Sequence, residues 1–294
     1  MLYRQIEQNK RKTVLLVLLF SLLVLATGAA IGYLGYGDAV PGLAIAAVFL
    51  AFYVPVTYLS ATAQVLRIAG ARPASREAYT QLYRIVEELC IPARLPMPRI
   101  YVVDDPSPNA FATGMKPEKG TVAFTTGLLE RLNREELEGV AAHELAHIRN
   151  YDIRLMTLSI ALVSVIIVLA DIGPRLLSQR HRGRDKKTHP ALLIIAVVLV
   201  ILAPIAAQFV HFAISRNREY LADATAVEFT RNPAGLRNAL IKIGGSDLDV
   251  RNAKRETAAM YIASPFARER KKPRTNWFST HPSIESRIER LERM

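Results

Sequence analysis

The chain has 294 residues, 51% of them hydrophobic, and its 38 basic and 26 acidic side chains leave a formal net charge of +12. This is enough apolar sequence for one catalytic domain together with several membrane-spanning segments. A single cysteine, Cys90, excludes an intramolecular disulfide and fits a reducing compartment. The positive charge is compatible with nucleic acid or with anionic lipid, so its distribution along the chain has to separate these classes of partner.

Two uncharged apolar segments lie near the start of the chain. Residues 13–33 and 40–66 are each long enough, at about 1.5 Å per helical residue, to cross a hydrocarbon layer of about 30 Å. The first is too long for a signal-peptide core, so we expect it to be retained. Basic residues flank the pair on both outer sides, whereas the connecting turn carries only Asp38. The positive-inside rule then predicts a transmembrane hairpin over residues 1–66 with both ends in the cytoplasm.

A second pair of apolar segments, residues 155–177 and 191–214, encloses a strongly basic loop. A hairpin that crosses the bilayer twice would place this loop outside, against the positive-inside tendency. Either the first hairpin sets the topology and the second pair also crosses, or the second pair is tilted, re-entrant or packed against protein. We expect two crossings because the loop is short, which makes the chain a multi-pass protein of the cell membrane.

The remaining sequence, residues 67–154 and 215–294, has the combined size of one domain, and neither part looks complete alone. Apolar residues recur at helical spacing from Ser75 to Cys90 and predict a helix. Short β-branched segments at residues 99–103 and 121–125 predict two strands. The expected fold is therefore α+β and mainly helical, with a small sheet, attached to two hydrophobic hairpins.

The next predicted helix carries the clearest chemical signal. Asn133 with Glu136 three residues later is typical of a capped helix start, and the apolar spacing continues to about Arg149. His143 and His147 lie four residues apart on this helix, so both rings project from one side and are placed to bind one metal ion.

Glu144 follows the first of these histidines directly, beside the metal but placed to act as a base instead of a ligand. Zinc brings the pKa of a water molecule to about 7, and a carboxylate at this position can remove its proton and return it to the leaving amine. This is the chemistry of peptide-bond hydrolysis. The alternative is a chance His-Glu-x-x-His string whose histidines only form hydrogen bonds.

A catalytic zinc needs a third protein ligand, and Glu219 is the best candidate in the sequence. Asp223 lies one turn further along the same helical face, where it would hydrogen-bond a ligand histidine and fix its tautomer. The alternative is a solvated acidic pair among neighbouring arginines.

Four motifs occur along the chain in one order: NAFATG at residues 109–114, HELAHIRNYD at 143–152, SRNREYLAD at 215–223 and THP at 280–282. With these motifs and two hydrophobic hairpins, the chain resembles the HtpX-type membrane metalloproteases, relatives of the CAAX prenyl endopeptidases, over nearly its whole length.

The resemblance implies a gluzincin-like fold in which His143, His147 and Glu219 bind one Zn²⁺ per subunit, Glu144 is the catalytic base and Asp223 is a supporting residue. It also implies a role in membrane-protein quality control, in which the enzyme cuts misfolded or damaged membrane proteins without ATP. Two other hypotheses remain for the same residues: a membrane scaffold with a structural zinc, and a transporter.

The resemblance further places Asn109, Ala110 and Phe111 beside an edge strand to which an extended substrate peptide adds; the alternative is a turn between strands. His281 is a candidate hydrogen-bond donor to the tetrahedral oxyanion, or else a histidine at a helix start. The basic cluster at residues 268–274 has no accompanying series of stacking aromatic residues, so we expect no nucleic acid and favour contact with the anionic bilayer; a solvated face is the alternative.

Overall fold

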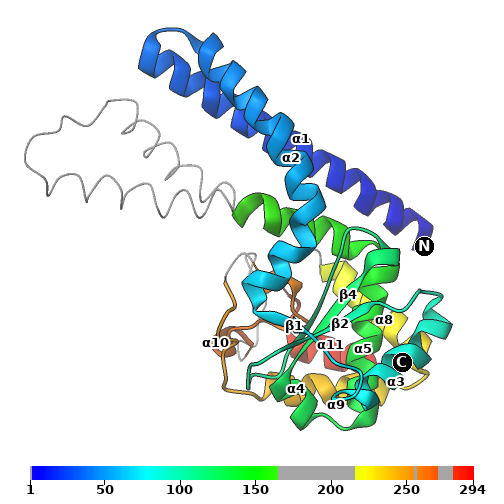
Figure 1. Ribbon diagram of the computed structural model, residues 1–294. Coiled ribbons are helices and arrows are strands. Elements are labelled where there is room, and N and C mark those ends of the chain that lie inside the picture. Colours follow the sequence, from blue (N-terminus) through cyan, green and yellow to red (C-terminus); the bar gives the residue numbers. More distant parts are fainter. Residues whose placement is uncertain (1, 165–215, 255–256, 271–280) are drawn as a thin grey trace, which may run out of the picture.

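The computed structural model describes residues 2–164, 216–254, 257–270 and 281–294 (Figure 1). Most of the second apolar pair and the cations at residues 271–274 therefore lie outside the described residues. Arg270 belongs to the cluster expected at the lipid surface, and for this residue the expectation is wrong. It is 4% exposed, and its guanidinium donates to the backbone carbonyls of Ser246, Leu248 and Ser264, so it holds two loop segments together.

Helices α1 (Leu2–Tyr36) and α2 (Ala39–Ala69) form a long antiparallel hairpin that projects from the rest of the protein (Figure 1). The side chain of Asp38 caps α2 by accepting from the Val40 amide. Both helices are long and apolar enough to cross a membrane, and only 11% of the residues in each most apolar window are buried. Such extensive exposed apolar surface fits a bilayer better than water.

The two helices approach each other closely where both are glycine. A Cβ built on Gly42 would lie 2.0 Å from the Gly28 carbonyl oxygen, so neither position has room for a side chain. Small residues at such contacts are typical of helix pairs in membranes, where close van der Waals packing drives association.

A four-stranded sheet has the order β1-β2-β4-β3. Its strands are β1 (Ala71–Pro73), β2 (Arg99–Val103), β3 (Ala110–Thr113) and β4 (Thr121–Thr125). The central pair β2 and β4 is parallel, while β1 and β3 are antiparallel to their neighbours. The predicted strands β2 and β4 are confirmed at both ends.

Alternate residues of the strands pack on opposite faces of the sheet, as the period of two requires. One face packs against α3 (Thr80–Ala93) and α5 (Arg134–Arg149). The other face packs against the last turns of α2. The last turns of α2 are therefore part of the domain core.

Helix α3 begins later than Ser75, where the sequence predicted it. The Ser75 hydroxyl accepts from the Ala78 amide and holds a turn before the helix, and Pro92 is accommodated in the last turn. Helix α5 matches its prediction: Asn133 and Glu136 form a reciprocal capping box at its start.

The C-terminal part of the chain covers α5. Its elements, together with the two short helices that follow β3 and β4, are η1 (Pro117–Lys119), α4 (Thr126–Arg131), α8 (Arg216–Thr230), α9 (Pro233–Gly244), η2 (Ala258–Met260), α10 (Ala267–Arg270) and α11 (Ile284–Glu292). Helices α8 and α9 pack on α5, and α11 packs on α9. The mainly helical α+β class with a small mixed sheet is confirmed.

Candidate active site

The two histidines of α5 meet at the edge of the core. Their Nε2 atoms lie 3.1 Å apart, because residues four apart share one side of the helix. The His143 side chain is fully buried, whereas that of His147 is 15% exposed.

Glu219 in the first turn of α8 faces both rings. Its two carboxylate oxygens lie 3.7 Å from His143 Nε2 and 3.6 Å from His147 Nε2. Ala222 and Ala226 on the same helix are buried, and their small side chains allow α8 to approach α5 closely. The structure thus brings together three ligand atoms, all within 4.8 Å of one another, which sequence reasoning had assigned to one metal ion.

Each histidine is oriented from its far side by a carboxylate. Asp223 Oδ1 lies 2.9 Å from His143 Nδ1, and Asp152 Oδ2 lies 3.0 Å from His147 Nδ1. With both Nδ1–H groups donating to carboxylates, both Nε2 lone pairs face Glu219. Asp223 is where the sequence predicted a supporting residue, whereas the role of Asp152 was missed.

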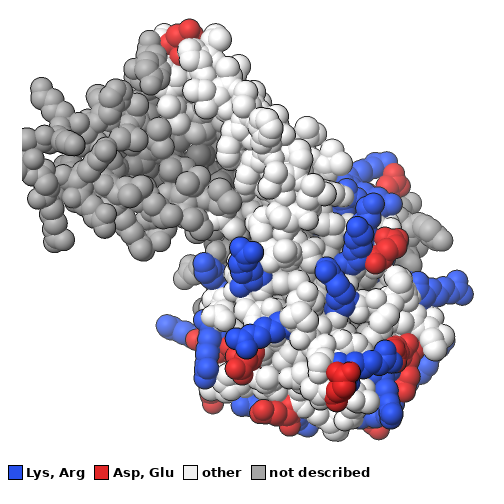
Figure 2. Space-filling model, viewed as in Figure 1, with Lys and Arg blue, Asp and Glu red and all other residues white. Residues whose placement is uncertain are grey.

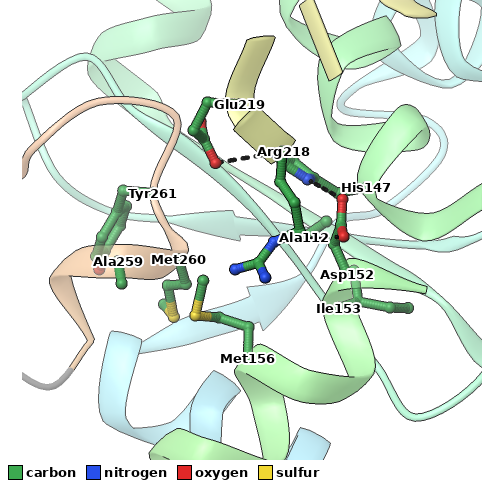
Figure 3. Close-up of a pocket in the computed structure, with 10 residues that line it drawn as sticks. All are labelled: Ala112, His147, Asp152, Ile153, Met156, Arg218, Glu219, Ala259, Met260 and Tyr261. Atoms are coloured by element: carbon green, nitrogen blue, oxygen red, sulfur yellow. Dashed lines mark hydrogen bonds and ion pairs between the residues drawn. The ribbon is translucent and has the colours of Figure 1, made fainter. Parts of the chain in front are cut away.

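Asp152 reaches His147 because the chain reverses just after α5. Tyr151 adopts φ 60°, a left-handed conformation, and the next residue turns back toward the histidine. Asn9 of α1 donates to the second oxygen of Asp152 at 2.6 Å, and Arg218 Nε lies 3.5 Å from the same oxygen (Figure 3). The membrane hairpin therefore contacts the group that orients His147. The HELAHIRNYD motif contains Asp152, but nothing in it indicates the reversal.

Arg287 on α11 is a second positioning residue that the sequence did not reveal. It is 1% exposed, and its guanidinium donates to both oxygens of Asp223 at 2.9 and 2.6 Å and to the Ile262 carbonyl at 2.5 Å. Burial alone would raise the pKa of Asp223, but Arg287 and His143 outweigh it and hold the pKa below its usual value. Arg287 thus keeps the carboxylate that orients His143 charged.

Glu144 and Glu219 have opposite electrostatic environments. Burial raises the pKa of Glu144 to about 8, and neither of its carboxylate oxygens has a hydrogen-bond partner of normal geometry within the described part of the chain. Burial also disfavours charged Glu219, but His143 and His147 outweigh it and bring its pKa far below the usual value. One buried oxygen of Glu219 likewise lacks a hydrogen-bond partner among the described residues. A divalent cation between the imidazoles would compensate these oxygens, so the residues fit zinc.

A small pocket opens beside His147 and Glu219, with Ala112 of β3 on one wall and sulfur and aromatic side chains opposite (Figure 3). The apolar part of this lining comes from Ile153, Met156, Ala259, Met260 and Tyr261. Asp152 and Arg218 complete the lining, so the pocket beside the metal cluster has both apolar and charged groups on its walls.

The three residues expected at the substrate-binding edge lie on or next to β3, but their side chains are buried. Asn109 Nδ2 donates to the Ala263 carbonyl, and Ile262 N donates to the Ala110 carbonyl. Phe111 also forms an isolated β-bridge with Tyr261. The edge is therefore already paired at these positions.

Ala112 is the residue of β3 that borders the pocket. By the alternation of the antiparallel ladder, its amide and carbonyl face away from β4, as those of Ala110 do, toward the side of the strand where Glu144 and Tyr261 lie. Sequence reasoning missed Ala112 because nothing in the NAFATG motif shows which of its residues borders the pocket.

His281 is buried near Glu219. Its Nε2 lies 2.6 Å from the Tyr261 carbonyl oxygen and donates to it. Burial, reinforced by Arg287, lowers the pKa of the ring, although Glu219 opposes this. A neutral imidazole ring has one N–H group, and in His281 this group is bonded to the Tyr261 carbonyl. To donate to an oxyanion, the ring would have to give up this hydrogen bond.

The sequence matches known proteases over its whole length. The family model described as Peptidase family M48 matches residues 76–294. The chain is 47% identical over 306 aligned residues to a "Protease HtpX homolog" of Listeria monocytogenes serotype 4a (strain HCC23), with all of both chains covered. It is 49% identical over 299 residues to a "Protease HtpX homolog" of Ligilactobacillus salivarius (strain UCC118), again with both chains covered completely. The chain belongs to peptidase family M48.

Among solved structures, this M48 chain is similar to one titled "Crystal Structure of S. mikatae Ste24p", with a TM-score of 0.49 and 18% identity over 99% of this chain and 67% of that chain. The resemblance to HtpX-type proteases is confirmed by the M48 family match and the full-length relatives. The chain is a membrane metalloprotease, and its cluster of His143, His147 and Glu219 fits a zinc site.

Proposed function

We propose that this M48 protease is a zinc-dependent endopeptidase that hydrolyses misfolded or damaged membrane proteins at the cytoplasmic face of the cell membrane. The observation that supports it best is the convergence of His143, His147 and Glu219, with the buried carboxylate of Glu144 next to them. The cytoplasmic orientation is supported by the basic residues at the outer ends of α1 and α2.

Zinc, when bound, supplies Lewis acidity that polarises a peptide carbonyl and makes a water molecule acidic. Glu144 is the only carboxylate on α5 beside the three ligands, and we assign it the transfer of the proton from water to the leaving amine. A neighbouring cation favours the ionised form of Glu144, which burial disfavours in the metal-free protein. Asp223 and Asp152 hold the two imidazoles so that their Nε2 atoms stay directed at one point.

We assign the binding of an extended substrate peptide to β3 at Ala112, because its backbone amide and carbonyl face away from β4, and this residue borders the pocket beside the metal cluster. Asn109, Ala110 and Phe111 then act indirectly, because their contacts hold the strand that carries Ala112. His281 is our candidate for stabilising the oxyanion: its N–H would leave the Tyr261 carbonyl and donate to the oxyanion instead.

The test is the Glu144→Gln variant of the full-length protein, compared with Glu138→Gln on the same helix, which lies outside the metal cluster. Glu144→Gln should bind one zinc ion per chain and lose hydrolysis of casein and of an unfolded membrane protein, because the ligands remain and the base is removed. Glu138→Gln should keep both zinc and activity. Full activity of Glu144→Gln would refute the mechanism, and a zinc-loaded wild type that cuts neither substrate would favour a structural metal.

A further inference from the structure

A second cavity lies where the hairpin joins the domain, on the sheet face opposite α5. It has a volume of about 620 Å³ and is lined by the last three turns of α2, by β1 and β2, and by residues 115–119. It shares no lining residue with the pocket beside the metal cluster. A cavity of this size takes a ligand of a few hundred cubic ångströms, such as a lipid headgroup.

The charged lining of this groove is entirely cationic. Arg67, Arg99, Lys116 and Lys119 all border it, all four are exposed, and no carboxylate is among the lining residues. None of the four forms an ion pair with another residue that the structure describes. Glu118 stands between the two lysines in sequence and is exposed, but it does not line the groove. Four cations around one cavity repel one another, and an anion bound among them relieves this repulsion.

Apolar residues, mostly on α2, form much of the remaining lining, which continues into the exposed apolar surface of this helix. Leu59 borders the groove and is 84% exposed, and Tyr58, Leu66 and Met115 are among the other apolar lining residues. From Leu59 the apolar surface runs up the hairpin, while Arg67 is the first cation along α2. Cations typically mark the depth of the headgroups, so the groove lies at the boundary between acyl chains and headgroups.

Figure 2 shows the same boundary on the visible face: apart from an acidic group at its tip, the projecting part of the hairpin carries no charged side chain, and Lys and Arg side chains gather where it meets the domain. Such a surface matches a molecule with an apolar tail and a phosphate-bearing anionic head. A free phosphate would satisfy the cations but leave the apolar lining uncovered. A protein partner would have to enter the headgroup layer to reach the groove.

We propose that this groove binds one anionic phospholipid of the surrounding bilayer, with its phosphate among Arg67, Arg99, Lys116 and Lys119 and an acyl chain along α2. Arg67 belongs to the hairpin, whereas the other three belong to the domain. A lipid held by both parts therefore ties the hairpin to the domain. The proposal does not require the protein to be an active peptidase.

The test uses full-length protein carrying Glu144→Gln, so that self-cleavage cannot interfere, in micelles of a neutral detergent. Lipid binding is followed by native mass spectrometry and by the shift in Tm. The probes are phosphatidylglycerol, phosphatidylcholine with the same acyl chains, glycerophosphoglycerol without acyl chains, and inorganic phosphate. We expect phosphatidylglycerol alone to bind at one molecule per chain and to raise Tm.

The double variant Arg99→Gln/Lys119→Gln should bind phosphatidylglycerol about thirtyfold more weakly, since each basic residue near an anionic membrane surface contributes about fivefold. The matched control is Arg84→Gln/Arg94→Gln, which removes two exposed cations at α3, on the other face of the sheet. Unchanged binding in the first variant, equal loss in the control, or equal binding of phosphatidylcholine would overturn the proposal. Equally tight binding of glycerophosphoglycerol or phosphate would overturn the assignment of a lipid.

Discussion

Replacing Asp152 by Ala tests whether this carboxylate positions the metal ligand His147. The variant removes the acceptor 3.0 Å from His147 Nδ1 while leaving all three metal ligands in place. Loss of such a partner typically lowers metal affinity or activity by about 10–100-fold, or about 1.4–2.7 kcal/mol. Because the His147 side chain is 15% exposed, water can replace part of the lost hydrogen bond, and we expect the lower end, about tenfold.

The corresponding Asp223→Ala change should be more damaging. Its histidine, His143, is fully buried, and Arg287, which is 1% exposed, would lose its nearest carboxylate and, among the described residues, keep only Glu219 at 3.9 Å. We therefore expect about a hundredfold loss of zinc affinity together with a lower Tm. The order of the two variants follows from the greater burial of His143 and from the contact between Asp223 and Arg287.

The assays are zinc competition with a chelating dye and kcat/KM on a peptide substrate, with Asn9→Ala as the third variant. Asn9 acts on His147 through Asp152, so Asn9→Ala should cost only a few-fold in zinc affinity and nothing further when Asp152→Ala is already present. Wild-type zinc affinity and kcat/KM in Asp152→Ala, or an additive effect of Asn9→Ala in the double variant, would refute this reasoning.

Three further outcomes are expected. Arg287→Met should lower the free energy of unfolding by about 3–5 kcal/mol, because it leaves the buried Asp223 carboxylate without its cationic partner, and Asp223→Asn should restore part of this in a double variant; thermal melts in detergent measure both. In metal-free protein the pKa of Glu144 is raised from 4.5 to about 8, so the folded state binds a proton that the unfolded chain has lost, and the free energy of unfolding should fall as pH rises across that window; Glu144→Gln should flatten this dependence. In a Cys90→Ser background, a membrane-impermeant thiol reagent should label Asp38→Cys only from outside the cell and Glu138→Cys only from inside, and labelling of both from one side contradicts the proposed orientation.

Several features of this protein follow from its sequence because their causes act over a few residues. The capping box at Asn133 and Glu136 and the apolar spacing that follows determine α5. The β-branched segments determine β2 and β4, and the long uncharged segments determine the hairpin of α1 and α2. The spacing of His143 and His147 places both rings on one side of the helix wherever the helix packs.

The tertiary structure alone decided how distant segments meet. The approach of α8 to α5 brings Glu219 within 3.7 Å of both imidazoles, and the left-handed turn at Tyr151 returns Asp152 to His147. The sequence indicates only that Arg287 is one polar residue of an amphipathic helix, and the packing of α11 makes it the partner of Asp223. These contacts depend on the directions in which helices cross and loops return, which are set by the shape of the whole core. No local pattern of residues encodes them.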